Sequence, residues 1–572
     1  MAGGNNNIIP FPGTSANAAA AGSSSSGSGT PSTGGGSGGG GGGSPVSDPY
    51  EWSRARVWSI RYLKKYNEDQ KRRILVNFII TNETRKTPHG AFLKTSDKRA
   101  YLFDGGLGAC KLYKIDEKDA EFRGYMQLAY GLNSSEQLTR HVMSALQNAT
   151  IATGLLRDVR RFSYWDRYRQ TLYISRYDGT CYEIDGDEIK VRNNGYGSAV
   201  FLDDDGGFNC DAPPDDGPIV GNHHELMKQL IDDLNYVPTT SGSMSPATQR
   251  TCLGIWLFAV AFPDLMPTKP IMLVEGMPGS GKTFALQRIA MTLHGKSAPL
   301  TIAKKEDPDF GVKILRSPLA IIDDVNTTIE WLQDTLCSYA TGGTWSKRKL
   351  FTDDTEHVIR PHSFLQITSN NPTTFRQGQL ADRCLIIRLE RRTDNFGSAD
   401  QLLERAQSWR PQLQGEWLYW LNEIVRELRR PQPMMTSPYR MADFARVAHV
   451  IGRVLNQEAG PPGDWSPEAI DEMLAAMQAE RDALVIGEGD QLIELLDKWL
   501  DVVSNQGREV RVADLHRELA MLAKMAGNQT FFKSPKGLAA RLREAGGALG
   551  RHFEVTRQTG AGDVMMYTFR RT

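Results

Sequence analysis

The residues best suited to chemistry lie in one short run, IMLVEGMPGSGKTFAL, which spans Ile271 to Leu286. An apolar stretch enters a glycine-rich turn, and a helical pattern begins at Lys282 and Thr283. This is the pattern G-x-x-x-x-G-K-[ST] between a strand and a helix, in which backbone N–H groups and the start of the helix bind phosphate oxygens. The lysine can reach the β- and γ-phosphates, and the threonine hydroxyl can bind Mg²⁺. The sequence therefore predicts a site for ATP and Mg²⁺, formed by Gly276, Met277, Pro278, Gly279, Ser280, Gly281, Lys282 and Thr283.

Polar residues follow two later apolar runs. Asp323 and Asp324 end the run LAII, and Asn370 comes shortly after the run SFLQI. A carboxylate at the tip of a neighbouring strand can hold Mg²⁺, and a second one can polarise the attacking water. We assign Asp323, with Thr283, to the metal and Asp324 to the water, although the two aspartates could exchange roles. Asn370 is predicted to orient the water, a role that its Asn-Pro turn also permits.

An arginine precedes the next apolar run, CLIIRL. Arg383 is the preferred candidate for a residue that stabilises transition-state charge on the γ-phosphate of a neighbouring subunit. Its position before the run, rather than within it, favours the necessary reach. Arg388, Arg391 and Arg392 are alternatives. An arginine supplied by a second copy implies a homo-oligomeric ring or filament.

The segment TGGTWSKRKLFTDDTEHVIRPHSF separates the carboxylates from Asn370. Two extended runs flank a TDDT turn, so we expect a β-hairpin. Strand alternation places Trp345, Lys347 and Lys349 on one face and Arg348 on the other. Aromatic and basic residues together suit a single nucleic-acid strand, which stacks its bases and pairs its phosphates with cations. The composition fits a solvated edge hairpin equally well.

The order of these motifs resembles a family. GMPGSGKT, IIDD, TGGTWSKRKLF, ITSNNP and LADR together look like the superfamily 3 type and related AAA+ helicases of phages, plasmids and chromosomal islands, a group that includes the ATPases of poxvirus-type primase-helicases. The resemblance is specific across about Lys269 to Arg392. It implies an α/β P-loop AAA+ core and a hexameric ring that hydrolyses ATP and moves along single-stranded or forked DNA. The paired aspartates, rather than Asp-Glu, are similar to superfamily 3.

Two departures from the family pattern matter. No recognisable primase motif precedes the predicted ATPase, so primase activity is not expected of this chain. The hairpin tip, Thr352 to Thr355, is acidic rather than basic, which leaves open which residues contact DNA.

Composition changes divide the 572 residues into five parts. Residues 1–46 are a Gly/Ser-rich tail that we expect to be disordered, because it cannot bury enough apolar surface to fold. Residues 47–220 are predicted to form an α+β domain and residues 221–397 the ATPase core, with preceding helices at 221–265. A helical region, 398–488, and a winged helix, 489–572, follow. Within the α+β domain, the runs Ile74–Ile80, Ala91–Leu93 and Ala100–Phe103 are predicted strands, and turn dipeptides after residue 170 predict a β-meander.

The C-terminal part shows the order helix, helix, helix and hairpin, which is the winged-helix plan. Lys536 and Arg541 lie in the third helix and are candidate DNA contacts. Such modules also serve as protein-interaction or lid domains.

Overall composition sets limits on the class of protein. The 67 basic and 67 acidic residues balance, so nucleic-acid contacts must come from local patches. The six cysteines are widely spaced, which is typical of a reducing compartment and of neither a disulfide framework nor a zinc ribbon. No apolar run is long enough to cross a membrane, and we expect the cytoplasm of a prokaryotic cell, with a phage or mobile element as the source.

Three functions fit these features. The leading one is an ATP-driven DNA helicase in phage or mobile-element replication, working with a primase or other replication proteins. A helicase loader or initiator without processive unwinding is the first alternative, and a nucleotide-switched DNA-binding regulator is the second. The basic insert and the trans arginine favour the motor.

Overall fold

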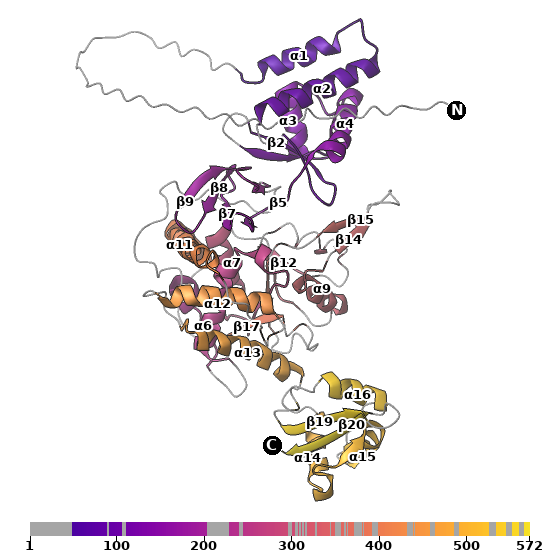
Figure 1. Cartoon of the computed structure of the whole chain (residues 1–572), viewed down its shortest axis with the longest axis vertical. Helices are drawn as coiled ribbons and strands as arrows, with labels where there is room; N and C mark the ends of the chain where they lie inside the picture. Colours follow the sequence, from indigo (N-terminus) through magenta and orange to yellow (C-terminus); the bar gives the residue numbers. More distant parts are fainter. Residues whose placement is uncertain are drawn as a thin grey trace, which may run out of the picture. The chain divides into compact units, whose positions relative to one another are not determined.

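A computed structural model describes most of the chain from Asp48 onward (Figure 1). The described residues are 48–87, 91–105, 110–202, 228–238, 244–295, 300–303, 307, 310–311, 314, 317, 319–325, 329–343, 345–348, 356–359, 362, 364–370, 380, 383–391, 399–431, 437, 439, 441–457, 464–485, 491–525, 534–544, 549, 552–559 and 565–571. The predicted tail, the tip of the predicted hairpin, Lys349 and Arg392 lie outside them. The chain forms two compact units, residues 1–159 with 195–202 and residues 160–194 with 203–572.

The first unit packs four helices against a four-stranded sheet. The helices are α1 (Glu51–Arg61), α2 (Glu68–Lys86), α3 (Ala120–Tyr130) and α4 (Gln137–Thr153). The sheet has the order β3 (Lys111–Lys114), β2 (Ala100–Asp104), β1 (Phe92–Lys94), β4 (Leu155–Leu156), and β10 (Val200–Phe201) pairs separately with β5 (Val159–Arg160). The predicted strands at Ala91–Leu93 and Ala100–Phe103 therefore correspond to β1 and β2.

The predicted strand at Ile74–Ile80 is wrong, because these residues form the middle of α2. Asn67 caps this helix: its side chain accepts from the Gln70 backbone N–H, and the Gln70 side chain accepts from the Asn67 N–H. The buried positions of α2 are Leu75, Val76, Ile79, Ile80 and Glu83, which is helical spacing. A short apolar run does not show by itself whether its apolar residues repeat with the period of a helix or of a strand. The capping box that precedes this run is the sequence signal that indicates a helix.

The second unit begins with the predicted meander. Strands β6 (Ser163–Asp166), β7 (Thr171–Ser175), β8 (Thr180–Ile184) and β9 (Ile189–Asn193) form one antiparallel sheet in chain order. Its apolar face joins the core of the second unit, where Phe162 lies against Trp417 and Trp165 against Phe262. The sequence grouped these strands with residues 47–220, whereas the structure packs them with the region that follows.

The centre of this unit is a parallel five-stranded sheet. Its order is β12 (Leu300–Thr301), β13 (Leu319–Ile322), β16 (Phe364–Ser369), β11 (Ile271–Gly276), β17 (Cys384–Leu389), and every neighbouring pair is parallel. Residues Ile271 to Glu275 and all of β13 and β16 are buried, as expected for strands covered on both faces. The unit is thus an α/β fold, and all five strands point their carboxyl ends to one edge.

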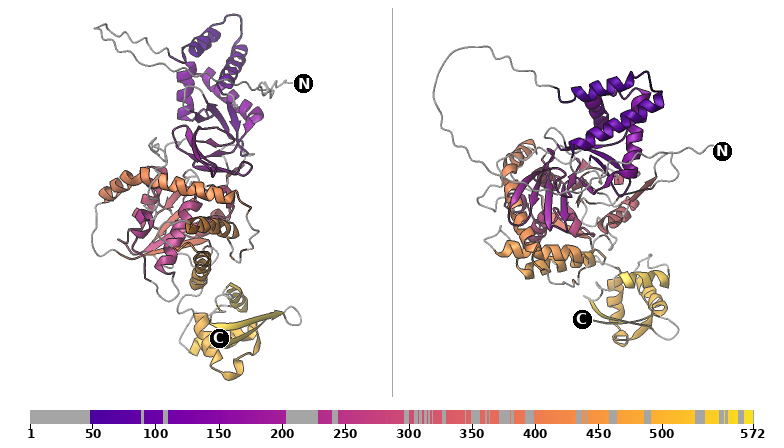
Figure 2. Two further views of the ribbon diagram at one scale, coloured as in Figure 1. Left: turned by 60° about the vertical axis from the view of Figure 1, so that its left-hand side comes forward. Right: turned by 45° about the horizontal axis from the view of Figure 1, so that its top comes forward.

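Helices cover the sheet. They are α6 (Pro246–Ala259), α7 (Lys282–His294), α9 (Glu330–Ala340), α11 (Ala399–Leu428), α12 (Ala442–Gln457) and α13 (Pro467–Val485), with short turns η1 (Lys228–Asp232) and η2 (Pro263–Leu265). Helix α6 is almost wholly buried, which agrees with the apolar run at its centre. Figure 2 (left) shows α11, in orange, crossing beneath the meander. There the Gly186 N–H donates to Asn422 Oδ1 over 3.1 Å, and Arg426 Nε donates back to the Gly186 carbonyl over 2.7 Å.

The predicted hairpin is confirmed as β14 (Trp345–Arg348) and β15 (Glu356–Ile359), which pair antiparallel between α9 and β16. The C-terminal part has its own core and contains α14 (Gln491–Leu500), η3 (Val503–Asn505), β18 (Glu509–Arg511), α15 (Val512–Met525), α16 (Pro535–Glu544), β19 (Phe553–Thr559) and β20 (Met565–Arg571). The expected element order is present, with β18 as an additional strand beside β20. No helix within the described residues is long and apolar enough to cross a membrane.

Candidate active site

The predicted P-loop connects β11 to α7, as its strand–turn–helix pattern requires. Gly281 has φ +83° and directly precedes the first residue of α7, a conformation that favours glycine. A β-carbon at Gly276 would lie 2.3 Å from the carbonyl oxygen of Leu389 on the neighbouring strand. The loop therefore needs glycine for close backbone approach at one end and for a left-handed turn at the other. Met277, Pro278 and Gly279 are exposed, so the loop is open to solvent.

Lys282 extends back into this loop. Its Nζ donates to the carbonyl oxygens of Gly276 (2.6 Å) and Met277 (3.1 Å), and to Asn370 Oδ1 (3.0 Å). Burial lowers the pKa of Lys282, and the nearby Asp324 and Asp323 carboxylates oppose that shift. The ammonium is thus held between the loop and the end of β16.

The two aspartates follow β13 and are held by Thr368, near the end of β16. The Thr368 hydroxyl donates to Asp323 Oδ1 over 2.7 Å and accepts from the Asp324 N–H over 2.8 Å. Asp323 Oδ1 also accepts from Thr283 Oγ1 over 2.8 Å. Asp324 has φ +50°, a conformation that non-glycine residues adopt mainly where surrounding contacts impose it, often at active sites. Sequence reasoning missed Thr368, whose role depends on β16 lying beside β13.

Asn370 completes one connected set of side chains. Its Nδ2 donates to Asp324 Oδ1 over 2.5 Å, while its Oδ1 accepts from Lys282. The structure therefore brings together Lys282, Thr283, Asp323, Asp324 and Asn370, from three strands that end at the same edge of the sheet. Parallel strands present their carboxyl ends together, which is where ligands bind in open α/β sheets.

Arg391 is a further cation beside the loop. It follows β17 and is exposed, and its Nε would lie 3.5 Å from a β-carbon placed on Gly279. It makes no hydrogen bond or ion pair with other residues in the described part of the chain. The sequence offered it only as an alternative residue acting on a neighbouring copy, and the pairing of β17 with β11 places it on the loop of its own chain. Arg388, another alternative, instead pairs with the buried Glu275 over 3.1 Å.

Arg383 lies away from this set. It precedes β17 at the amino edge of the sheet, where its carbonyl accepts from the Ile271 N–H over 2.8 Å. Six residues of β11 separate that edge from the loop, roughly 17 Å at 3.3 Å per residue. The side chain is 7% exposed, and Nη1 donates to Cys337 Sγ over 3.3 Å. Arg383 therefore cannot reach the loop of its own chain in this conformation.

The candidate DNA contacts also lie outside the set. Trp345, Lys347 and Arg348 belong to β14, which follows α9 in the sequence. Lys536 and Arg541 belong to α16, where Lys536 is exposed and Arg541 half-buried. The Ser534 hydroxyl accepts from the Gly537 N–H over 3.2 Å and caps this helix.

The donor set around Asp323 suits Mg²⁺ shared with a phosphate. Within the described residues, no group of three or more His, Cys, Asp or Glu side chains could hold a metal without help. Mg²⁺ bound with a nucleotide usually has only one or two protein ligands, and phosphates and waters complete its coordination shell. The Thr283 hydroxyl and the Asp323 carboxylate, 2.8 Å apart, could supply these ligands. The residues fit a metal that arrives with a nucleotide.

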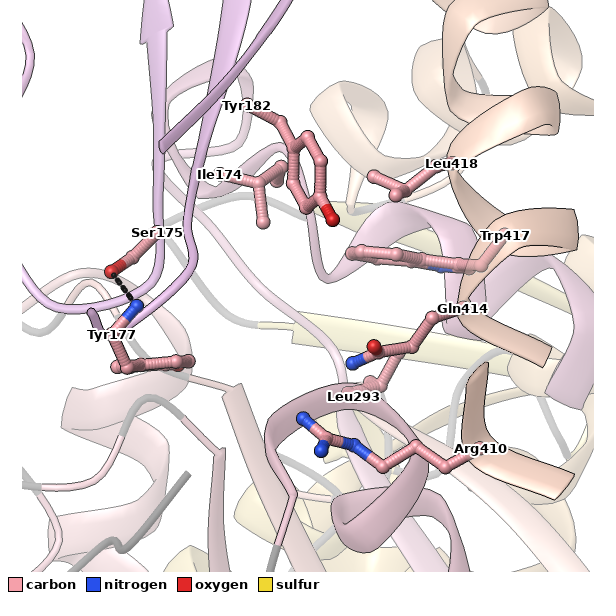
Figure 3. A pocket seen from close by; sticks show the side chains of 9 residues that line it. All are labelled: Ile174, Ser175, Tyr177, Tyr182, Leu293, Arg410, Gln414, Trp417 and Leu418. Carbon is pink, nitrogen blue, oxygen red and sulfur yellow. Dashed lines mark hydrogen bonds between the residues drawn. The ribbon is translucent and has the colours of Figure 1, made fainter. Parts of the chain in front are cut away.

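A separate small cavity lies between the meander, the end of α7 and α11 (Figure 3). It has a volume of about 20 Å³, which is room for one water. Gln414 and Arg410 of α11 face it from one side, and Ile174 and Tyr182 of the meander from the other. The Gln414 Oε1 is buried and accepts no hydrogen bond from the described residues, so a water there would satisfy it. This cavity is distinct from the side chains around the loop.

A protein-family model matches part of the chain. Residues 242–456 match the model described as the actinomycete integrative conjugative element replication protein. The matched segment contains the loop, both aspartates, the hairpin and Asn370. It supports a role for this chain in the replication of a mobile genetic element. No curated protein matches the chain.

Two solved structures show weak similarity to the chain. The apo structure of the NrS-1 C terminal region (305–718) aligns with a TM-score of 0.38 and 10% identity, covering 83% of this chain and 95% of that one. An A form apo structure of the same region aligns with a TM-score of 0.37 and 11% identity, covering 84% and 96%.

Proposed function

We propose that this chain is an ATP-hydrolysing DNA helicase of the AAA+, superfamily 3-like type, which assembles as a hexamer and acts in mobile-element replication. One observation carries the proposal. Lys282, Thr283, Asp323, Asp324 and Asn370 form a single hydrogen-bonded set at the carboxyl edge of a parallel sheet. Asp324 bonds to Asn370, which bonds to Lys282, and Asp323 bonds to Thr283. Both aspartates are thus linked to the start of the helix after the glycine loop, which an ordinary pair of turn aspartates would not need.

Each side chain has a role that its position supports. Lys282 and the loop N–H groups would bind the phosphates, and the lysine would exchange its bonds to the loop carbonyls for phosphate oxygens. Thr283 and Asp323 would hold Mg²⁺, which supplies charge neutralisation on the phosphates when it is bound. Asp324 is exposed, so water can reach its carboxylate, which would accept a proton from the attacking water. Asn370 touches both Lys282 and Asp324 and can fix that water between them.

The coupling of hydrolysis to DNA movement would use the hairpin. Strand β15 leads through His362 to β16, which carries Thr368 and is followed directly by Asn370. A change at the nucleotide end of β16 can therefore displace the hairpin at the opposite end. Arg383 lies at that same amino edge, buried against Cys337, and its proposed action on a neighbouring copy would require the side chain to leave that contact.

ATP hydrolysis by the purified full-length chain tests the nucleotide part of the proposal. The parent should hydrolyse ATP with Mg²⁺, and single-stranded DNA should stimulate it. Lys282→Ala should abolish ATP binding, whereas Asp324→Asn should bind ATP and lose at least 100-fold in kcat, the scale of an acid–base group. Equal hydrolysis by the parent and Lys282→Ala would contradict the site. Hydrolysis without strand displacement on any fork would instead support the loader or initiator.

A further inference from the structure

We infer that the exposed face of α1 and the turn after it, in the first unit, bind single-stranded DNA. The surface consists of Trp58 and Tyr62 together with Arg56, Lys64 and Lys65, and we call it the aromatic–basic face. This inference goes beyond the proposed function, because the side chains assigned to ATP and the predicted hairpin all belong to the second unit. The first unit would thereby take its own part in holding DNA.

Two aromatic side chains of this face are exposed and lie against each other. Trp58 and Tyr62 are 64% and 66% exposed, and their ring centroids are 4.8 Å apart. They are separated by one helical turn, and the Tyr62 N–H donates to the Trp58 carbonyl oxygen over 3.3 Å. Within the part of the chain that the structure describes, both exposed tryptophans, Trp52 and Trp58, belong to α1. Large rings that gather in solvent indicate a binding surface.

The helix that carries these rings is held through its opposite face. Val57 and Ile60 are each 1% exposed and belong to the core of the first unit. Arg54 Nη1 donates to a backbone carbonyl of α3 over 2.8 Å, and Arg61 forms an ion pair with Glu136. Figure 1 shows α1 beside α2 at the surface of this unit. Because packing already fixes the helix, the exposed rings lose little backbone freedom when a ligand binds.

The cations of the face are not engaged by other parts of the described chain. Arg56, Lys64 and Lys65 are exposed, and none of their side chains forms a hydrogen bond or an ion pair with another described residue. From residue 51 to residue 73 the chain carries eight basic and three acidic residues. Two of these acidic residues already form ion pairs within α2, over 2.9 and 3.2 Å. The face is therefore positively charged, which suits a polyanion.

A pair of exposed rings beside three cations fits a single nucleic-acid strand. An unpaired base can stack on a ring while the cations pair with the neighbouring phosphates. Duplex DNA keeps its base faces inside the double helix, so it would contact only the cations. An apolar protein surface would cover the rings and leave the cations unmatched. The combination of charge and aromatic side chains therefore favours single-stranded DNA.

Fluorescence anisotropy with a labelled oligo(dT) strand of about 30 nucleotides tests the inference on the full-length chain without ATP. Trp58→Ala should raise Kd roughly five-fold to a hundred-fold, the loss expected for one base stack. Trp58→Phe keeps an aromatic ring and should retain most of the parental affinity. Trp58→Leu keeps only apolar character and should lose as much affinity as Trp58→Ala.

The salt dependence of the same binding tests the cations. Arg56→Gln, Lys64→Gln and Lys65→Gln, combined in one chain, should reduce the slope of log K against log salt by about 2, at about 0.7 per lost phosphate contact. Arg446→Gln is the control, because this exposed arginine lies on α12 in the second unit, and it should leave the slope unchanged. Lys282→Ala should bind the strand as the parent does, because the aromatic–basic face does not include the P-loop.

The outcomes keep this inference separate from the proposed motor. If Trp58→Ala binds oligo(dT) as tightly as the parent, the inference is overturned, whatever ATP hydrolysis and strand displacement show. If Trp58→Leu binds as tightly as Trp58→Phe, the ring acts through apolar contact, as in a protein interface, and base stacking is wrong. If the Trp58 variants behave as expected but the parent displaces no strand, the face binds DNA and only the helicase proposal fails.

Discussion

Thr368 shows how one hydroxyl can organise an active site. It bonds both to Asp323 and to the backbone of Asp324, so it fixes the carboxylate proposed to bind Mg²⁺ and the strained turn together. Thr368→Val keeps the shape and removes both bonds. We expect kcat for ATP hydrolysis to fall roughly 10- to 100-fold, as for other groups that orient metal ligands, with a much smaller change in Kd for ATP.

Thr335→Val provides the matched control for that variant. Thr335 also donates a hydroxyl hydrogen bond, to the Trp331 carbonyl one turn earlier in α9, where it does not touch the site. Its kcat should stay within twofold of the parent. Equal losses in the two variants would mean that Thr368 acts through general stability.

Arg391 provides a second test at the level of single residues. Its guanidinium lies beside Gly279, so it should stabilise bound phosphate from its own chain. Arg391→Ala should raise Kd for ATP roughly tenfold, equal to about 1.4 kcal/mol for one charge-assisted contact. Isothermal titration with a non-hydrolysable ATP analogue measures this directly. An unchanged Kd, matching that of Arg446→Ala, would remove Arg391 from the site.

Lys269 gives a pH-dependent prediction. It is buried before β11, and burial lowers its pKa from an ordinary value of 10.5 to about 8. Between these pH values the unfolded chain holds more protons than the folded one, so the free energy of unfolding rises with pH. Lys269→Met has no titratable group at this position, so its stability lacks this contribution to the pH dependence. The parent should gain stability relative to Lys269→Met from pH 8 to about 10.5, by up to about 3 kcal/mol.

Thermal midpoints of the parent and Lys269→Met, measured in parallel across that pH range, check this sign. Lys269→Met should be the more stable at pH 7, and the difference should shrink as the pH rises. A difference that stays constant from pH 7 to 10.5 would show that Lys269 does not change its charge on unfolding.

At the scale of elements, the junction of the meander with α11 depends on Gly186. Its φ is +88°, and a β-carbon there would lie 2.8 Å from Arg426 Cα and 2.9 Å from Arg426 N. Gly186→Ala should therefore weaken the junction by about 1–3 kcal/mol, combining backbone strain with overlap. Amide hydrogen exchange of β8 and β9 should accelerate accordingly.

Gly131→Ala is the control for backbone strain alone. Gly131 has φ +63°, but a β-carbon there would make only ordinary contacts with Arg54 at 3.7 Å and beyond. It should leave exchange in β8 and β9 unchanged. If Gly186→Ala also leaves them unchanged, the close approach of α11 does not hold the meander in place.

The sequence predicted elements whose signals are local and missed those that depend on tertiary contacts. The P-loop flanks, the hairpin at Trp345 and the run LAII were readable because turn residues bound apolar runs of clear length. Asp323, Asn370 and Lys282 each follow an apolar run in the sequence, and this pattern predicted that they meet where neighbouring strands end. The bonds of Thr368, the position of Arg391 and the packing of the meander could not be read, because each depends on which strand or helix lies alongside. The strand predicted at Ile74–Ile80 was wrong because this apolar run is too short to show whether its period is that of a helix or of a strand.

At the scale of the whole molecule, the proposed helicase has active sites that a second copy completes. Arg383 lies at the opposite edge from its own loop and is buried against Cys337, so its proposed role in catalysis requires assembly to release the side chain toward a neighbour. Lys282→Ala and Arg383→Ala should each be inactive alone. Mixed in equal amounts, they should recover about a quarter of parental ATP hydrolysis, because a ring with heterologous contacts then contains some intact interfaces.

Recovery in the mixture would also show that both variants fold and assemble. No recovery, with both variants forming the same assembly as the parent by light scattering, would contradict a role for Arg383 in trans. Its buried contact with Cys337 would then be its function.

The match to a conjugative-element replication protein supports a role in replication, and DNA unwinding is the activity proposed for this chain. Strand displacement from a forked DNA duplex, with ATP and Mg²⁺, measures it most directly. The parent should displace the strand, Lys282→Ala should not, and Lys349→Ala should hydrolyse ATP but unwind poorly. A parent that hydrolyses ATP yet displaces no strand from forks of either polarity would contradict the central claim.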